Sequence, residues 1–211
     1  AGYPTGVKWD LLKKAVADRK YIICNADEGD PGAYMNRNEI ESDPHSLLEG
    51  MIICGLAVGA TRGFVYLRSE YPDAERVFSR AIAIAREAGL LGPSIRGSGH
   101  AFDVELRRGA GAYVCGEETA LLESLEGKRG VVRFRPPVPA VSGLLGKPTA
   151  LNNVNTFASV PIILDRGADF YRDFGVGKSR GTVAFQLGGN VKRGGLVEMA
   201  MGITLRELVE D

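Results

Sequence analysis

The stretch "FDVELRRGAGAYVCGEETALLESLEG", residues 102 to 127, decides the expected fold class. Its first part, "FDVELRR", is predicted to be a strand, and its last part, "EETALLESLEG", a helix. Gly109, Gly111 and Gly116 lie between them. Glycines at such a junction allow backbone N–H groups to approach phosphate oxygens, and the helix N-terminus adds partial positive charge. Because the spacing does not meet the G-x-G-x-x-G fingerprint, the turn is either a phosphate-binding loop or a tight turn without a ligand.

Outward from this stretch, helices and strands alternate, which is typical of an α/β fold. Further strands are predicted over residues 20–26 and 63–68, and helices over residues 7–18, 42–60, 72–92 and 152–164. The last of these helices is expected to break or end near Pro161. Residues 27–37 and the Pro-, Gly- and Arg-rich residues 127–148 are predicted to be loops.

The character of the chain changes after residue 180. Two short strands around a "KRGG" turn and the start of a helix are predicted for residues 181–211. This pattern indicates the first part of a small β-rich module. We therefore expect two units, residues 1–180 and residues 181–211.

Composition excludes several classes of function. Lys and Arg together number 26 among 211 residues, and Asp and Glu also number 26, so no basic field draws the chain to nucleic acid. The longest uncharged apolar run, Met51 to Ala60, is shorter than the roughly 20 residues that cross a bilayer. Cys24, Cys54 and Cys115 form no CxxC pair, so we expect no disulfide framework, no metal site and a cytoplasmic location.

Two clusters of acidic residues follow predicted strands. Asp27, Glu28 and Asp30 follow one strand, and Glu117 and Glu118 follow the glycine turn. A carboxylate at a helix N-terminus gains roughly 0.3 to 1 kcal/mol from the helix dipole, which accounts for one of the glutamates. In an α/β sheet such loops gather at the carboxyl edge, where ligands bind. This much negative charge disfavours a plain phosphate and favours a ligand with ring N–H groups, hydroxyls or an amide.

Several polar residues could complete such a site. Lys8, Arg107 and Arg108 could offset the acids and receive phosphates. Asn152 and Asn153 lie at the start of a predicted helix and offer more donors and acceptors than one helix cap uses.

Five motifs in one order resemble a known family. They are "AGYPTGVKW", "YIICNADEGDPGAY", "RRGAGAYVCGEETALLESLEGKRG", "RPPVPA" and "GKPTALNNV", between residue 1 and about residue 158. Together they resemble the NADH-binding FMN flavoprotein subunit, the 51-kDa type, of respiratory complex I and of related NAD-linked hydrogenases and formate dehydrogenases. The resemblance implies a Rossmann-like FMN- and NADH-binding domain with a glycine-rich cofactor cavity over residues 1–180. The start of a ubiquitin-like β module is implied for residues 181–211.

The resemblance also implies the roles of individual residues. The expected FMN contacts are Gly2, Lys8, Asn25, Asp27, Tyr113, Gly116, Glu117, Asn152 and Asn153. The expected NADH contacts are Tyr3, Lys8, Glu28, Asp30 and Glu118. Asp30 and Glu118 are expected to tune the flavin potential and product release, since the cofactors carry the hydride chemistry and no side chain needs to act as acid or base.

The family extends further than these motifs. Its members carry a [4Fe-4S] cluster in a C-terminal domain, so we expect this chain to be a fragment of a longer subunit whose partners are a thioredoxin-like [2Fe-2S] subunit and a larger iron–sulfur subunit. Three positions depart from the family pattern. Tyr3 replaces a Phe, Val138 replaces an aromatic residue that stacks on adenine, and Asn155 replaces a Glu.

Other functions stay open at this point. A flavoprotein subunit of a hydrogenase or formate dehydrogenase shares the same motifs. A hydrolase using Glu117 and Glu118 is disfavoured, because adjacent helical residues point about 100° apart and cannot flank one bond. A truncated chain without catalytic activity is the third alternative.

Overall fold

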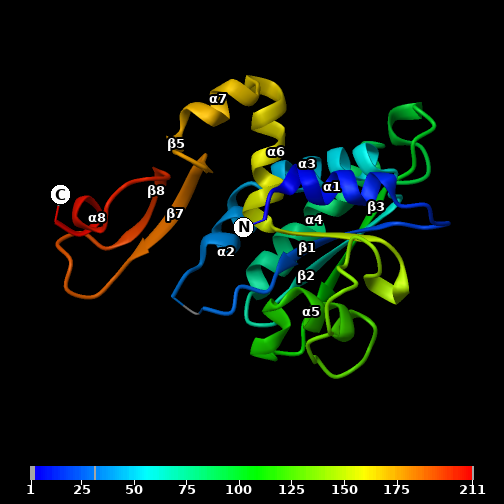
Figure 1. The fold of residues 1–211 in the computed structure, drawn as a ribbon, viewed down its shortest axis with the longest axis horizontal. Helices are drawn as coiled ribbons and strands as arrows, with labels where there is room; N and C mark the ends of the chain where they lie inside the picture. The colour runs from blue at the N-terminus through cyan, green and yellow to red at the C-terminus, as the bar shows by residue number, and fades with distance from the viewer. Residues whose placement is uncertain (1–2, 31, 211) are drawn as a thin grey trace.

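The computed structural model describes residues 3–30 and 32–210, and its centre is a four-stranded parallel sheet in the order β3-β2-β1-β4 (Figure 1). The strands are β1 (Tyr21–Ala26), β2 (Arg62–Leu67), β3 (Asp103–Arg108) and β4 (Thr149–Asn153). In β1, Ile23 pairs with Phe64 on one side and with Leu151 on the other. The α/β prediction is confirmed.

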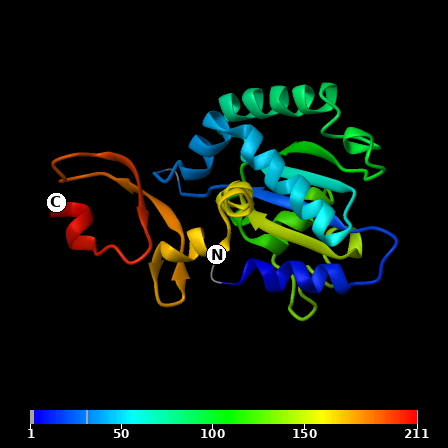
Figure 2. The same ribbon diagram turned by 90° about the horizontal axis from the view of Figure 1, so that it is seen from above.

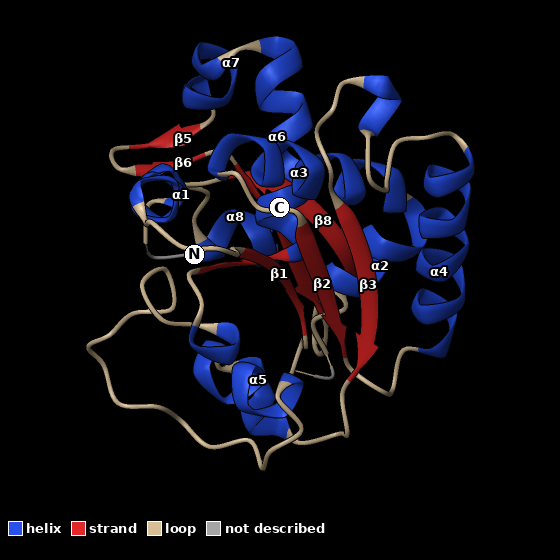
Figure 3. Ribbon diagram, turned by 90° about the vertical axis from the view of Figure 1, so that its right-hand side faces the viewer, coloured by secondary structure: helices blue, strands red, loops and turns tan. Residues whose placement is uncertain are grey.

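Helices cover the two faces of the sheet unequally (Figure 3). One face packs against α1 (Thr5–Lys14), α2 (Met35–Ser42), α3 (Pro44–Val58), α4 (Pro72–Glu87) and α6 (Val154–Arg166). The other face packs against α5 (Glu118–Leu125) and the loops around it. In β1, Ile22 and Cys24 belong to the first core and Ile23 to the second, and all three are fully buried. Burial on both faces explains why this strand is apolar throughout.

The strand order reverses at β1, so the carboxyl ends of β1 and β4 form the topological switch point of the sheet. The chain runs from β1 through β2 to β3 in one direction and then returns to place β4 on the opposite side of β1. The first crossovers use α3 and α4 on the helix-rich face, whereas the last crossover uses α5 on the other face. Ligands bind beyond the carboxyl ends of the strands at such a switch point.

Two elements near this switch point, β4 and α2, were not predicted. Strand β4 falls where the sequence indicated a loop and then a helix, because Asn152 and Asn153 are poor strand formers. Helix α2 falls partly in a predicted loop, because only Asn36 and Ile40 of its residues are buried and the apolar pattern is weak. The prediction of a break at Pro161 is wrong, since α6 continues through it to Arg166.

The C-terminal residues form a separate arrangement beside the sheet (Figures 1 and 2). It comprises α7 (Ala168–Asp173), β5 (Gly175–Val176), β6 (Ser179–Arg180), β7 (Thr182–Leu187), β8 (Gly195–Ala200) and α8 (Leu205–Glu210). Strands β7 and β8 pair antiparallel and α8 follows, as the sequence predicted. The boundary at residue 180 stays a prediction.

Short 3₁₀ turns complete the path of the chain. They are η1 (Ile95–Gly97), η2 (Tyr113–Gly116) and η3 (Leu144–Gly146). Cys24 and Cys54 are buried, as expected for small apolar side chains, and Cys115 is buried too. In the part of the chain that the structure describes, no helix combines the length and the apolar character needed to cross a membrane.

Candidate cofactor site

Two loops meet at the carboxyl edge of the sheet. Residues 27–34 follow β1, and residues 109–117 follow β3. The Asn25 side chain donates a hydrogen bond of 2.9 Å to the carbonyl oxygen of Gly116, which joins the two loops. A Cβ on Gly116 would lie 3.2 Å from the carbonyl oxygen of Asp27, and one on Gly29 would lie 2.8 Å from the Tyr113 ring. A side chain at residue 29 would therefore displace the exposed Tyr113 ring from its present position.

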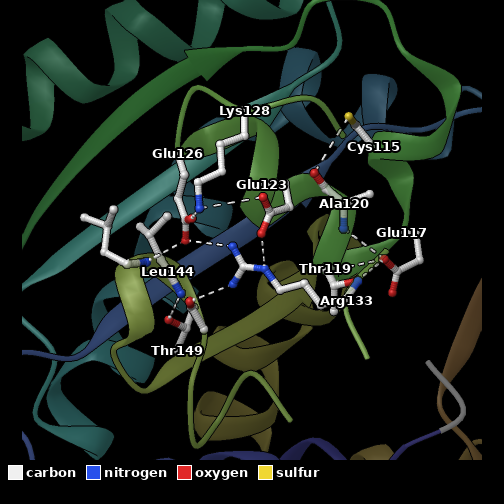
Figure 4. Close-up of polar contacts among 12 residues, drawn as sticks. Cys115, Glu117, Thr119, Ala120, Glu123, Glu126, Lys128, Arg133, Leu144 and Thr149 are labelled. Atoms are coloured by element: carbon white, nitrogen blue, oxygen red, sulfur yellow. Dashed lines mark hydrogen bonds and ion pairs between the residues drawn. The ribbon is translucent and has the colours of Figure 1, made fainter. Parts of the chain in front are cut away.

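Glu117 caps the N-terminus of α5 (Figure 4). Its Oε2 accepts hydrogen bonds from the backbone N–H groups of Thr119, at 2.8 Å, and Ala120, at 2.9 Å, and from the Thr119 hydroxyl at 2.6 Å. Its Oε1 pairs with the guanidinium of Arg135. Burial raises the pKa of the Glu117 carboxyl, but these hydrogen bonds and Arg135 outweigh it, and the pKa lies below its ordinary value.

Glu118 lies between two cations. Its Oε1 is 2.8 Å from Nη1 of Arg135, and its Oε2 is 3.7 Å from Nζ of Lys8. Lys8 also donates a hydrogen bond of 2.7 Å to the carbonyl oxygen of Leu151 in the middle of β4. Lys8 thus joins helix α1 to β4 and to Glu118, and Arg135 spans both glutamates.

The loop after β1 uses its three acids in different ways. Glu28 is only 8% exposed, and its carboxylate accepts hydrogen bonds from the first turn of α2. Asp27 is half-buried; burial raises the pKa of its carboxyl, and the nearby Arg68 opposes the shift without cancelling it. Asp30 is exposed, and its carboxylate accepts a hydrogen bond of 2.9 Å from the Gly32 N–H.

The two adjacent asparagines point in different directions. Asn153 caps α6 and exchanges hydrogen bonds with the side chain of Asn36 at 3.1 and 2.8 Å. Its Nδ2 also lies 3.4 Å from the carbonyl oxygen of Asn25. Asn152 is 3% exposed, and its Oδ1 accepts a hydrogen bond of 3.0 Å from the indole N–H of Trp9. Asn153 is therefore tied to the loop edge, and Asn152 to helix α1.

Arg133 holds the long loop of residues 127–148 against α5 (Figure 4). Its backbone N–H donates to the Thr119 hydroxyl at 2.9 Å, and its guanidinium donates to Glu123 at 2.5 Å. The same guanidinium is 2.8 Å from Glu126 and donates to the carbonyl oxygen of Gly143 at 3.0 Å. This network fixes the chain two residues before Arg135, so that Arg135 reaches the glutamates.

The residues predicted to contact FMN or NADH fall into three groups. Seven of them lie in the two loops or contact a residue of these loops: Lys8, Asn25, Asp27, Tyr113, Gly116, Glu117 and Glu118. Asn153 lies next to these residues, whereas Glu28, Asp30 and Asn152 make the separate contacts given above. Tyr3 is half-exposed, and Gly2 lies outside the described residues.

Two cations proposed from sequence have carboxylate partners outside the two loops, and three residues at this edge were not predicted. Arg107 pairs with Glu105, and Arg108 lies 3.5 Å from Glu75. The missed residues are Asn36, Arg68 and Arg135. Only Arg135 could have been found, as a cation within a Pro-rich loop, since the contacts of Asn36 and Arg68 depend on tertiary structure.

The residues at this edge fit a flavin mononucleotide better than a metal ion. Lys8 and the side-chain amides of Asn25 and Asn153 provide donors for phosphate and hydroxyl groups. The carboxylates of Glu117 and Glu118 provide acceptors for ring N–H and hydroxyl groups. Among residues 3–30 and 32–210, no three His, Cys, Asp or Glu side chains are grouped to hold a metal.

The fold and this edge define an α/β cofactor-binding domain. The chain belongs to the family described as the Nuo51 FMN-binding domain, which matches residues 1–162. It is 54% identical over 211 residues to the NADP-reducing hydrogenase subunit HndC of Solidesulfovibrio fructosivorans, and the match covers all of this chain and 43% of that protein. It is 52% identical to an NADH-quinone oxidoreductase subunit of Rhizobium meliloti, with 100% of this chain and 50% of that protein covered.

A solved structure supports the same assignment. The crystal structure of an NAD⁺-reducing [NiFe]-hydrogenase in the air-oxidized state matches with a TM-score of 0.85 and 39% identity, over 99% of this chain and 35% of the matched chain. The chain thus spans half or less of the length of these relatives.

Proposed function

We propose that this chain binds FMN at the carboxyl edge of β1 and β4 and NADH beside it, as part of an NADH-oxidising flavoprotein subunit. The observation that carries the proposal is the convergence of the two glycine-containing loops at the switch point, where Asn25 is bonded to Gly116. The family match over residues 1–162 supports FMN as the cofactor. Bound FMN would supply the redox chemistry between NADH, a two-electron hydride donor, and the iron–sulfur clusters of a parent complex, which take single electrons.

On the FMN side, the chain supplies both donors and acceptors. We assign Lys8, Asn25 and Asn153 to the phosphate and ribitol, because their amino and amide groups lie where β1 and β4 meet the two loops. The Tyr113 ring lies against Gly29 and is 80% exposed, and we assign it to the flavin. We assign the carboxylates of Asp27 and Glu117 to ring or ribitol donors.

On the NADH side, the chain supplies acceptors. We assign Glu118 and Asp30 to the nicotinamide carboxamide or the ribose hydroxyls, because Glu118 lies at the loop edge and Asp30 is exposed in the facing loop. Arg135 pairs with both Glu117 and Glu118, and with Lys8 near Glu118 two cations offset the two carboxylates, which reduces their repulsion of an anionic nucleotide.

The parent complex has two candidates. Relatives are named as subunits of NADH-quinone oxidoreductases and of NAD(P)-reducing hydrogenases, and the hydrogenase subunit HndC is 54% identical. We therefore propose an NADH dehydrogenase and, as the second candidate, a hydrogenase that reduces NAD⁺ or NADP⁺. Either complex would provide iron–sulfur partners, among them a thioredoxin-like [2Fe-2S] subunit.

The test is a flavin titration of the purified chain. FMN fluorescence should be quenched with a saturable dependence on protein concentration, and anaerobic NADH should then bleach the visible flavin absorbance. Lys8→Met should weaken FMN binding about tenfold, the effect of one lost charged hydrogen bond. A chain that leaves FMN fluorescence unchanged would contradict the proposal.

A further inference from the structure

Glu28 is the only buried carboxylate among the five acids of the two loops, at 8% exposed. Its Oε1 accepts hydrogen bonds from the backbone N–H groups of Met35, at 2.8 Å, and Asn36, at 3.2 Å. Its Oε2 accepts from the N–H of Arg37 at 3.4 Å and from the hydroxyl of Tyr71 at 3.2 Å. The first N–H groups of a helix have no partner within the helix, so Glu28 satisfies the three that begin α2. A carboxylate that is both buried and used in this way has little capacity left for a ligand.

Tyr71 closes the far side of this arrangement. It is 7% exposed, and its ring lies 5.2 Å from the guanidinium of Arg68 and 5.6 Å from that of Arg37. Burial and the neighbouring Glu28 raise the pKa of Tyr71 to about 12. The hydroxyl therefore stays protonated and donates to Glu28. Arg68 also donates to the backbone carbonyl of Glu28, so that both ends of this residue are held.

The helix turn that Glu28 caps leads directly to the FMN edge. Asn36 is 2% exposed, and its backbone N–H binds Glu28 while its side chain exchanges hydrogen bonds with Asn153. The Asn153 Oδ1 also accepts from the Asn155 N–H at 3.1 Å, and its Nδ2 lies 3.4 Å from the Asn25 carbonyl oxygen, so these bonds fix the position and orientation of the Asn153 side chain. A continuous path of hydrogen bonds thus runs from Tyr71 through Glu28 and Asn36 to Asn153.

We propose that Glu28 is a positioning residue of the cofactor site, which orders the loop of residues 27–30 and, through Asn36, sets the amide of Asn153 for FMN. This positioning role stands in place of the direct contact with NADH that the resemblance implied for Glu28. The inference rests on the proposed function, since it assigns Asn153 to FMN. Asp27 and Asp30, on either side of Glu28, are left as the acids of this loop that meet ligands.

Amide hydrogen exchange in the cofactor-free protein tests the anchoring. The amides of residues 35–37 should be protected in the wild type, because Glu28 is their acceptor. In Glu28→Ala they should exchange about tenfold faster or more, and in Glu28→Gln and Tyr71→Phe by an intermediate factor. Glu87→Gln removes the same charge from the exposed end of α4 and should change nothing. The milder variants decide the point if Glu28→Ala fails to fold.

Ligand titrations of the same variants test positioning against direct contact. The dissociation constant for FMN should rise about tenfold in Glu28→Ala and less in Glu28→Gln, whereas NAD⁺ affinity of the FMN-loaded protein should stay within about twofold. Wild-type amide protection and FMN affinity in Glu28→Gln, with weakened NAD⁺ binding, would overturn the inference. Failure of the wild type to bind FMN would contradict the proposed function instead, and the exchange experiment would still decide whether Glu28 anchors α2.

Discussion

The loops after β1 and β3 each contain one glutamate that caps a helix and one companion acid that does not. Glu28 accepts backbone hydrogen bonds from the first turn of α2, and Glu117 accepts them from the first turn of α5. The companion acids, Asp30 and Glu118, cap no helix of the sheet domain in the part of the chain that the structure describes. In each loop one carboxylate therefore orders the following helix, and we infer that its companion is offered to NADH.

The loops differ in how the structural carboxylate is neutralised. Neutral donors surround the buried carboxylate of Glu28, whereas Glu117 adds an ion pair with Arg135 at a position where the side chain is 32% exposed. A charge satisfied by fixed backbone dipoles needs no mobile partner, but a charge paired with an arginine responds to salt and to incoming phosphates. The Glu28 carboxylate is thus held by neutral donors alone, and the loop after β3, with its arginine-paired glutamates, is the responsive half of the site.

The largest expected effect is on the free energy of unfolding. It should separate the helix-capping acids, Glu28 and Glu117, from a companion acid, Glu118. Glu28→Ala should lower the free energy of unfolding by about 3 kcal/mol and Glu117→Ala by about 2 kcal/mol, because buried N–H donors lose a charged acceptor. Glu118→Ala should cost less than about 1 kcal/mol, as expected for a partly exposed ion pair. Urea unfolding without cofactor measures all three; equal losses in the three variants would remove the distinction.

The next largest effect is on NAD⁺ affinity, and its dependence on salt tests whether the loop after β3 responds to charge. Arg135→Gln leaves Glu117 and Glu118 without their shared cation, so the site becomes more negative toward anionic ligands. We expect the dissociation constant for NAD⁺ to rise about fivefold at low salt and less at high salt, because screening weakens the repulsion. The matched change Arg107→Gln, in a cation that pairs away from this edge, should leave binding unchanged. A loss that is independent of salt would point to a direct hydrogen bond instead.

The smallest effect concerns pH and has opposite signs in the two loops. The pKa of Asp27 is raised by burial, so its ionised form costs stability above the folded pKa, and Asp27→Asn should stabilise the cofactor-free chain at pH 7 by less than about 1 kcal/mol. The pKa of Glu117 is lowered, since its hydrogen bonds and Arg135 outweigh burial, so Glu117→Gln should destabilise it.

Both differences should shrink on acidification. The Asp27→Asn gain should vanish as the pH falls below the unfolded value of about 3.9, and the Glu117→Gln loss should vanish as the pH falls through the folded pKa of Glu117, below about 4.3. Urea midpoints across this range measure both variants. The same sign for both at pH 7 would contradict the assignment of burial as the dominant influence on Asp27.

The framework could be predicted from sequence where the apolar pattern was strong. Tyr21–Ala26 is nearly all apolar and forms the central strand as expected. Strand β4 could not be predicted in the same way, because its last two residues are asparagines, which are poor strand formers. Pro161 does not break α6, since contacts with α3 along the helix stabilise it in place of the lost hydrogen bond.

The residue types of the site could be predicted from the sequence, but the directions in which their side chains point could not. Asp27, Glu28 and Asp30 lie within four residues, and nothing in their order shows that the middle one turns into the protein toward Tyr71. Asn152 and Asn153 are equivalent in sequence, but strand alternation sends one to Trp9 and the other to Asn36. Directions of this kind depend on tertiary packing.

The most direct test of the account is an NMR map of backbone amide shifts during an FMN titration of this chain. We predict that the shifts concentrate in residues 25–36, 113–118 and 151–155, where the two loops and the end of β4 meet. A pocket of about 680 Å³ lies between α2, α6, α7 and the β7–β8 hairpin; Met35 and Asn155 line its near end, and Phe170, Phe174 and Leu196 line its far end. Shifts confined to the far end of that pocket, with the two acidic loops unchanged, would contradict the account.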